Sequence, residues 1–214
     1  MAEIDHIAVA NKKTLEDFVE SYFPGTSWKS FTHPTTSTPY TLTLTPSSAL
    51  SPTDFTSCFN LIERTSSDDY RHSKDGWNPR AKKREMRLLD LKYLLVRRHE
   101  KEDGGNGEGK VEGFVSFMPT WEDGVPVVYC YEIHLGEGLR GTGLGKTLMH
   151  YLLTIGKAIP SVKKVMLTVF TRNERAVAFY RKLGYEKDEY SPLPRVLRNG
   201  TVVEAEYVIL SRAV

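Results

Sequence analysis

A glycine-rich stretch between a strand-like run and an amphipathic helix is the feature that most constrains the fold of this chain. Residues 137–157 read "EGLRGTGLGKTLMHYLLTIGK" and directly follow the apolar run "VVYCYEIHL". Glycines ahead of a helix let the backbone approach a phosphate, and the free N–H groups and the dipole of the helix favour its negative charge. The stretch therefore predicts a strand, a phosphate-binding loop and a helix in that order.

Two common phosphate-binding motifs do not match this loop. A Walker loop needs glycine five residues before the glycine of Gly-Lys-Thr, but that glycine is Gly145 and Arg140 stands five residues earlier. A dinucleotide fingerprint could start at Gly141 and Gly143, but Lys146 takes the place of its third glycine. The pattern that the loop does satisfy is Arg-x-x-Gly-x-Gly, through Arg140, Gly143 and Gly145.

The rest of the chain alternates between helical and strand-like patterns. Apolar residues at helical spacing predict a helix from Thr14, and the capping pairs Ser51-Pro52 and Asn78-Pro79 predict two more. Alternation and turn residues predict the remaining elements, with a hairpin loop at 99–110. These are strands at 40–45, 92–98, 111–118, 125–135, 163–170 and 202–211, a helix after the glycine loop and a helix at 173–184. Their order indicates a mixed α/β fold.

Composition and charge narrow the class of protein. The chain has 214 residues, 40% of them hydrophobic, and a formal net charge of +2, which fits one globular domain without a strong pull toward nucleic acid or membrane. Cys58 and Cys130 match no metal-ligand spacing, so we expect no metal and a reducing compartment. The first residues carry no secretory pattern and no apolar run approaches about 20 residues, so we expect a soluble intracellular protein.

A basic stretch, "RAKKREMR" at 80–87, has five Lys and Arg residues. Such a run is typical of a solvated helix face, and we expect that here. The alternative is a nucleic-acid-binding module, but the stretch lacks interleaved aromatic residues and the whole chain is close to neutral.

At Arg140, Gly143 and Gly145 the chain resembles the GCN5-related N-acetyltransferase (GNAT) superfamily, whose loop binds the pyrophosphate of acetyl-CoA. A second signature of that superfamily is similar to "NERAVAFYRKLGY" at 173–185. The resemblance covers roughly residue 55 to the C-terminus. It implies a mixed central sheet with splayed middle strands and helices on both faces, with an N-terminal extension at 1–39 before a GNAT domain at 40–214.

The resemblance also implies acetyl-CoA as cosubstrate and a set of residues that bind it. Main-chain groups of the strand pair with the pantetheine, loop amides bind the pyrophosphate, and Asn173 and Tyr180 lie near the thioester. The full set is Ile133, His134, Leu135, Arg140, Gly141, Thr142, Gly143, Leu144, Gly145, Lys146, Asn173 and Tyr180. From the residues alone, Asn173 could instead cap a helix and Tyr180 could be a core aromatic.

Four short blocks point to a branch within the superfamily. "YCYE" at 129–132, "GWNPR", "MLTVF" and "YVILSR" resemble NatD, the N-terminal acetyltransferases dedicated to histones two-A and four. That resemblance implies acetylation of the α-amine of a tail beginning Ser-Gly-Arg-Gly, in cytoplasm and nucleus, by a monomer that contacts neither membrane nor nucleic acid. The chain departs from animal members of the branch at Asp75, where they carry tryptophan.

The NatD resemblance assigns Glu132 and Tyr131 as catalytic residues. Glu132 is implied as a general base acting through a water, with direct attack of the amine and no acyl-enzyme. Strict alternation places Glu132 on the face opposite Tyr129 and Tyr131, so the three can act together only where the strand is bulged or splayed. We therefore predict such a bulge. The alternative for Glu132 is a surface carboxylate on an exposed face.

The resemblance further implies a substrate site rich in tyrosine, with Glu122 pairing with the arginine of the tail; Asp123 is the alternative match for this acidic residue. Its members are Tyr70, Thr120, Trp121, Glu122, Tyr129, Tyr131, Thr168, Tyr190 and Tyr207. Other functions stay open: an acetyltransferase acting on a lysine side chain or a small amine, or a non-catalytic regulator that binds CoA.

Overall fold

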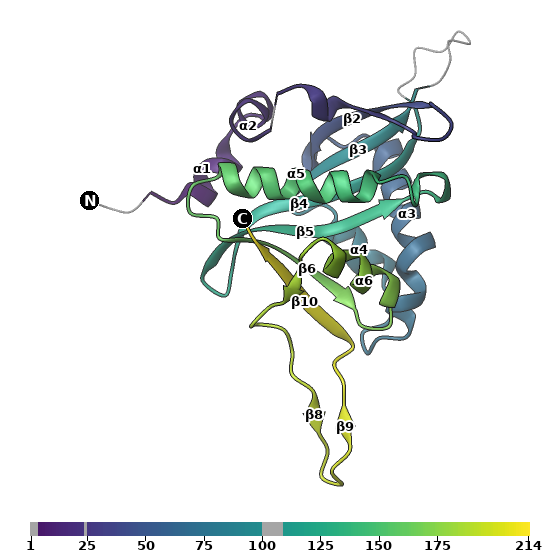
Figure 1. The fold of residues 1–214 in the computed structure, drawn as a ribbon, viewed down its shortest axis with the longest axis vertical. Coiled ribbons are helices and arrows are strands. Elements are labelled where there is room, and N and C mark those ends of the chain that lie inside the picture. The colour runs from purple at the N-terminus through teal and green to yellow at the C-terminus, as the bar shows by residue number, and fades with distance from the viewer. Residues whose placement is uncertain (1–3, 24, 100–108) are drawn as a thin grey trace.

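The computed structural model describes residues 4–23, 25–99 and 109–214. In these residues, an eight-stranded sheet runs through the molecule in the order β1-β2-β3-β4-β5-β6-β10-β7 (Figure 1). The strands are β1 (Ser30–Thr32), β2 (Pro39–Pro46), β3 (Lys92–Arg98), β4 (Val111–Glu122), β5 (Val125–Leu135), β6 (Lys164–Phe170), β7 (Glu186–Lys187) and β10 (Tyr207–Ala213). Strands β5 and β6 are parallel, and the other neighbours in this sheet are antiparallel.

Helices cover both faces of the sheet, which confirms the mixed α/β prediction. They are α1 (His6–Lys12), α2 (Leu15–Tyr22), α3 (Pro52–Arg71), α4 (Pro79–Glu85), α5 (Leu144–Ala158) and α6 (Glu174–Lys182). One hydrophobic cluster joins α1, α2, α5 and α6 to one face of the sheet, and a second joins α3 and α4 to the other. None of the helices in the described ranges is long and apolar enough to cross a membrane.

The predicted helix starts are confirmed by side-chain caps. Thr14 accepts a hydrogen bond from Asp17 N at 3.1 Å, and Ser51 accepts one from Asp54 N at 3.1 Å. Asn78 caps α4 by accepting from Ala81 N at 3.0 Å. Each side chain satisfies an amide that the helix itself leaves free. The short helix α1, capped by Asp5, was not predicted from the sequence.

The predicted last strand, 202–211, is wrong at its start. Strand β10 begins at Tyr207, which pairs with Phe170, the final residue of β6. Residues before Tyr207 run past the end of β6 and have no ladder partner there. Instead β9 (Val202–Val203) pairs with β8 (Arg195–Val196), a ribbon that projects from the body in Figure 1. The predicted loop at 99–110 lies mostly outside the described residues.

The N-terminal segment packs onto the domain that follows it. Phe18 of α2 is fully buried, and its ring centroid lies 6.3 Å from that of Phe117 in β4. Phe23 lies 6.4 Å from Tyr151 of α5, again between ring centroids. Strand β1 extends the sheet by pairing with β2. The domain boundary after residue 39 stays a prediction.

The predicted bulge and splay are both present in the middle of the sheet. In the β4–β5 ladder Ser116 faces Glu132 and Phe117 faces Cys130, so Tyr131 is an extra residue on β5. The parallel β5–β6 ladder extends only from Val127 to Cys130 on β5. Beyond Cys130 the two strands separate, and the edge of β5 that leads to the glycine loop is free of β6.

Candidate active site

The glycine loop has the conformation that a phosphate cradle needs. Gly141 and Gly143 have φ values of 76° and 87°, and Gly143 is the N-cap of α5. A Cβ at either glycine would meet no atom within 4 Å, so the surface of the loop is open. The first amides of α5, from Leu144 to Lys146, have no acceptor inside the helix; Leu144 N donates to the Thr142 hydroxyl at a long 3.4 Å, and the amides of Gly145 and Lys146 are available to an anion. The loop therefore fits a diphosphate group.

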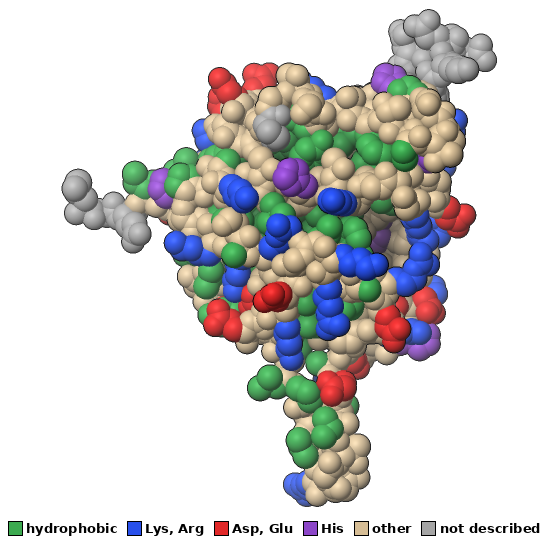
Figure 2. Space-filling model, in the orientation of Figure 1, with side chains coloured by type: hydrophobic (Ala, Val, Ile, Leu, Met, Phe, Trp, Pro, Cys, Tyr) green, Lys and Arg blue, Asp and Glu red, His purple; other side chains and the backbone are tan. Residues whose placement is uncertain are grey.

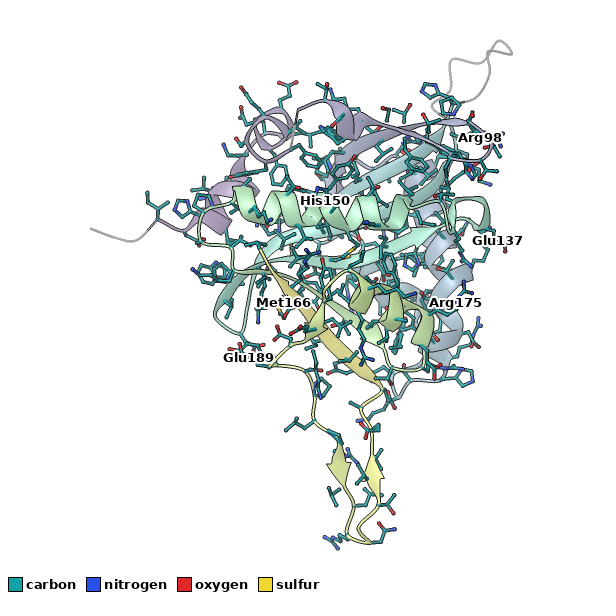
Figure 3. All side chains as sticks on the ribbon, in the orientation of Figure 1. Arg98, Glu137, His150, Met166, Arg175 and Glu189 are labelled. Carbon is teal, nitrogen blue, oxygen red and sulfur yellow. The ribbon has the colours of Figure 1, made fainter. Side chains whose placement is uncertain are left out.

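The start of α5 is held tightly against its neighbours. A Cβ on Gly145 would lie 3.3 Å from Phe179 of α6 and 3.6 Å from Leu135 of β5. The Thr142 hydroxyl donates to the Leu139 carbonyl at 2.8 Å and so fixes the turn. Figure 3 marks Glu137 at the loop and Arg175 on α6 at the same end of the molecule.

The surroundings of the loop suit a polyphosphate ligand with an extended arm. Figure 2 shows Lys and Arg side chains gathered over α5 and α6 on this face. Beyond the splay, the main chain of residues 133–135 is not paired with β6. Its amides and carbonyls can therefore pair with an extended amide chain such as pantetheine. Together these features fit acetyl-CoA.

Asn173 and Tyr180 take the structural roles that the sequence left open. Asn173 caps α6 by accepting from Ala176 N at 3.1 Å, and its amide donates to Asp69 of α3 at 3.0 Å. Tyr180 is 8% exposed and packs within the core, near Tyr185. Burial raises the pKa of the Tyr180 phenol well above its usual value. Cofactor contacts by these two residues stay predictions.

Glu132 is a largely buried carboxylate, which excludes the exposed-face interpretation. Its side chain is 11% exposed; Oε1 accepts from Lys82 Nζ at 2.8 Å, and Oε2 lies 2.5 Å from His134 Nε2. Burial alone would raise the pKa of Glu132, but the charge of Lys82 and then of His134 outweighs it and lowers the pKa to about 2. Glu132 is therefore ionised at any physiological pH.

The expectation of a solvated basic helix face is wrong at Lys82. Lys82 is only 6% exposed, and its ammonium also donates to Glu85 at 2.8 Å, whereas Lys83 beside it is exposed. Lys82 lies four residues before Met86, which is 2% exposed, so both share the buried face of α4. That spacing was the available signal, but Glu132, the partner that makes the burial tolerable, lies 50 residues away in the chain.

The predicted substrate tyrosines, except Tyr190, gather on the face of the sheet that α3 and α4 cover. The Tyr129 hydroxyl lies 2.6 Å from the Thr168 hydroxyl, and the rings of Tyr129 and Tyr131 are 5.3 Å apart. The ring of Tyr70 lies 4.8 Å from that of Phe170, the residue opposite Tyr207 in the ladder. The other members of this face are Thr120, Glu122 and Tyr207, which is 42% exposed.

Glu122 lies close to this aromatic group. Burial is the main cause that raises the pKa values of Tyr129 and Tyr131, and the charge of Glu122 adds to it at both residues. Burial, followed by Asp123, raises the pKa of Glu122 itself. A partly buried carboxylate beside tyrosines can pair with a basic side chain.

Trp121 and Tyr190 are not brought into the same group. Trp121 lies between Thr120 and Glu122 in β4, so alternation turns it to the other face, where it is 46% exposed. Tyr190 is 40% exposed, and its ring lies 5.3 Å from Lys164 Nζ, at the end of β6 away from Phe170.

Comparison with known proteins identifies the fold. A curated relative, N-alpha-acetyltransferase 40 of Saccharomyces cerevisiae, is 36% identical over 103 residues, which are 40% of this chain and 36% of the yeast protein. The solved structure of Arabidopsis thaliana NAA60 with a bisubstrate analogue has a TM-score of 0.58 at 14% identity, over 81% of this chain and 99% of that one. The same plant protein with acetyl-CoA gives a TM-score of 0.51 at 15% identity, over the same shares.

At these identities the solved structures support the fold, which is that of the GNAT proteins and confirms the prediction. The sequence profile of the acetyltransferase (GNAT) family matches residues 60–185. That span contains the glycine loop, the bulged strand with Glu132 and the whole of α6. The chain therefore belongs to the acetyltransferase (GNAT) family.

Proposed function

We propose that the protein is an N-terminal α-amino acetyltransferase of the NatD kind, which transfers acetyl from acetyl-CoA to the N-terminal serine of histones two-A and four. The observation that carries the proposal is the position of Glu132. It is a charged, buried carboxylate at the point where β5 bulges and leaves β6, between the tyrosine group and the glycine loop. The name of the yeast relative supports α-amine chemistry.

The chemistry follows from how these side chains are held. Acetyl-CoA, when bound, supplies the acetyl group as a thioester; the amine nitrogen would form the new bond to the carbonyl carbon as the carbon–sulfur bond breaks and CoA leaves as its thiol. The amides at 141–146 and the main chain at 133–135 would hold it. An α-amine has a pKa of about 7.7–8.0, so a fair fraction is neutral at physiological pH and a modest base suffices. Glu132, which is ionised, takes that part through a water molecule that lies between its carboxylate and the attacking amine.

Two neighbours of Glu132 in sequence have different parts. Tyr131 is the bulge residue, and burial, then Glu122 and Glu85, raises the pKa of its phenol. It is therefore a hydroxyl donor at neutral pH. Cys130 is buried, and burial followed by the charge of Glu132 raises the pKa of its thiol. A thiol held in that form is a poor nucleophile, which favours direct attack over an acyl-enzyme.

The tail of the substrate is proposed to lie over the tyrosines. The rings of Tyr70, Tyr129 and Tyr131 can cover the glycine of Ser-Gly-Arg-Gly, and Glu122 can pair with its arginine. Histone tails are the proposed partners, the protein is proposed to act as a monomer in cytoplasm and nucleus, and no contact with nucleic acid is required.

Mass spectrometry tests the proposal. The protein is incubated with acetyl-CoA and a Ser-Gly-Arg-Gly peptide, in parallel with an N-terminally blocked peptide that contains lysine. We expect one acetyl group on the α-amine of the first peptide and none on the second. Acetylation of the blocked peptide alone would indicate that the acceptor is a lysine side chain and not an α-amine. Binding of CoA with no turnover on either peptide would favour a non-catalytic regulator.

A further inference from the structure

Lys82 is the buried charge that joins the catalytic strand to the helices over the substrate face. From α4 its ammonium donates to Glu132 Oε1 and to Glu85 Oε1, each at 2.8 Å, and lies 4.8 Å from the ring centroid of Tyr70. The side chain is 6% exposed. Lysine is almost never buried to this degree unless it is paired, because the loss of hydration is costly.

The arrangement is specific to this lysine within the basic stretch. Lys83, the next residue, is exposed and its ammonium lies 4.3 Å from the ring centroid of Phe59. Only the lysine in register with the buried face of α4 reaches β5. If α4 needed only positive charge, Lys82 and Lys83 would be equivalent. Because only Lys82 contacts Glu132, the geometry indicates that Lys82 acts through that carboxylate.

Each oxygen of Glu132 has its own donor, and the two donors come from different elements. Lys82 on α4 holds Oε1, while His134 on β5 faces Oε2. His134 is in turn placed by Thr65 of α3, whose hydroxyl lies 2.6 Å from Nδ1. Removal of Lys82 would leave Oε1 buried without this donor and with one fewer positive charge beside it.

Other titratable groups around this carboxylate do not replace Lys82. The groups that interact electrostatically with Glu132 are Lys82, His134, Glu85, Tyr70, Tyr93, Cys130 and Tyr180. Of these, Lys82 and His134 favour the ionised carboxylate. The second carboxylate, Glu85, opposes it, and the phenols and the thiol are neutral at physiological pH.

We infer that Lys82 is a positioning residue for the transfer reaction: its ammonium keeps Glu132 charged and fixed in orientation, and its contact with Tyr70 couples that carboxylate to the substrate face. The inference rests on the proposed function, in which Glu132 receives the proton of the attacking amine. The inference adds Lys82 to the residues proposed to support the transfer reaction. Lys82 lies outside the cofactor loop and outside the group of Tyr70, Tyr129 and Tyr131, on a helix whose sequence suggests only a solvated surface.

The test compares Lys82→Met with Lys82→Arg, and with Lys83→Met as the matched control on the same helix. For wild type, Glu132 stays ionised, so log kcat/KM rises with a slope of about one below the pKa of the substrate amine. In Lys82→Met the pKa of Glu132 rises, so we expect kcat/KM to fall about tenfold or more at neutral pH and the slope to approach about two at lower pH. Lys82→Arg should restore the slope of wild type, and Lys83→Met should keep it.

A loss by one constant factor at every pH would overturn the inference that Lys82 keeps Glu132 charged, because the carboxylate would then stay ionised without it and only its position would have changed. A second readout does not depend on turnover: carbon-13 NMR of the Glu132 carboxyl. It should show an ionised group throughout the accessible pH range in wild type and a titrating one in Lys82→Met. An unchanged Glu132 signal in the variant would also overturn it.

A double-mutant cycle keeps the test decisive if Lys82→Met alone folds poorly. With Glu132→Gln as background, adding Lys82→Met removes both buried charges, and we expect no further loss of kcat. A further loss would show that Lys82 acts by another route. Failure of wild type to acetylate the peptide α-amine would instead remove the proposed function, and the NMR readout would still decide whether Lys82 holds Glu132 ionised.

Discussion

At the scale of single residues, the site depends on a carboxylate placed between two nitrogen donors. The Thr65 hydroxyl donates to the Leu61 carbonyl at 2.8 Å, so its oxygen is left to accept from His134 Nδ1. His134 lies within hydrogen-bond distance of Thr65 through Nδ1 and of Glu132 through Nε2. Glu132 then has a nitrogen partner at each oxygen, and the charge of Lys82 at Oε1 helps to keep this carboxylate ionised although it is largely removed from water.

Replacing Glu132 should change how stability depends on pH. Its folded pKa of about 2 lies below the value of about 4.3 for an unfolded chain, so its stabilisation is present above pH 4.3 and is lost as pH falls toward 2. Glu132→Gln leaves Lys82 with Glu85 alone, and we expect it to lower the free energy of unfolding by about 3 kcal/mol at pH 7. Urea unfolding at pH 7 and pH 3 measures the difference, which should shrink at the lower pH.

The exposed carboxylate of Glu186 on β7 provides the control for this measurement. Glu186→Gln should follow the pH dependence of wild type. A deficit of Glu132→Gln that stays the same at both pH values would contradict the ion-pair arrangement.

The candidate residues could be predicted from sequence only where they lie in a motif. Glu132 follows three residues that resemble a known block, and Gly143 and Gly145 satisfy a fixed spacing. Lys82 could not be assigned, because its role comes from a contact with a strand 50 residues further on. The spacing of residues predicts which side chains share a helix face. It does not predict which of those faces packs against a strand that carries a charged side chain.

At the scale of elements, the bulge in β5 and the turn into α5 define the site. The extra residue at Tyr131 changes the alternation, so that Glu132 lies on the same face of the sheet as Tyr129 and Tyr131. The bulge could be predicted because strict alternation would place Glu132 on the face opposite Tyr129 and Tyr131, whereas the proposed chemistry needs all three on one face. The early start of the last strand was wrong because "VVEAEYVILS" alternates well enough, while its first residues have no partner past Phe170.

The turn before α5 should tolerate a side chain at one glycine and not at another. Gly143 has a φ of 87°, where an alanine costs about 1–2 kcal/mol, and the strain would distort the amides at the helix start. We therefore expect Gly143→Ala to weaken acetyl-CoA binding about tenfold, as measured by isothermal titration calorimetry. Gly138→Ala is the control: Gly138 is not among the positive-φ glycines, and a Cβ there meets no atom within 4 Å. Equal affinity of both variants would argue against this turn as the cradle.

At the scale of the whole molecule, the N-terminal segment and the GNAT sheet share one hydrophobic cluster. Residues of α1 and α2 are buried together with residues of β4 and α5. The helix starting after Thr14 could be predicted from apolar spacing, but α1 could not, because seven residues carry little periodic signal. The short strand β8 was missed for the same reason, since it has two residues, and β9 was included in the predicted last strand.

The buried contact of α2 should be measurable as stability of the entire domain. Phe18→Ala removes a fully buried ring that packs on Phe117, and we expect a loss of about 3–5 kcal/mol in the free energy of unfolding. Leu15→Ala on the same helix shortens the side chain of a residue that is 38% exposed. Its loss in the free energy of unfolding should be well below that of Phe18→Ala. Chemical denaturation measures the free energy of unfolding of both variants. A Phe18→Ala variant as stable as wild type would show that α2 is not integral to the fold.

The most direct test of the central claim is a crystal structure with a conjugate of CoA and a Ser-Gly-Arg-Gly peptide. We predict that the diphosphate contacts the amides at 141–146 and that the peptide nitrogen faces Glu132, with the tail over Tyr70 and Tyr131. A conjugate whose diphosphate lies elsewhere, or whose peptide leaves on the face opposite α3 and α4, would exclude these positions for the cofactor and the substrate.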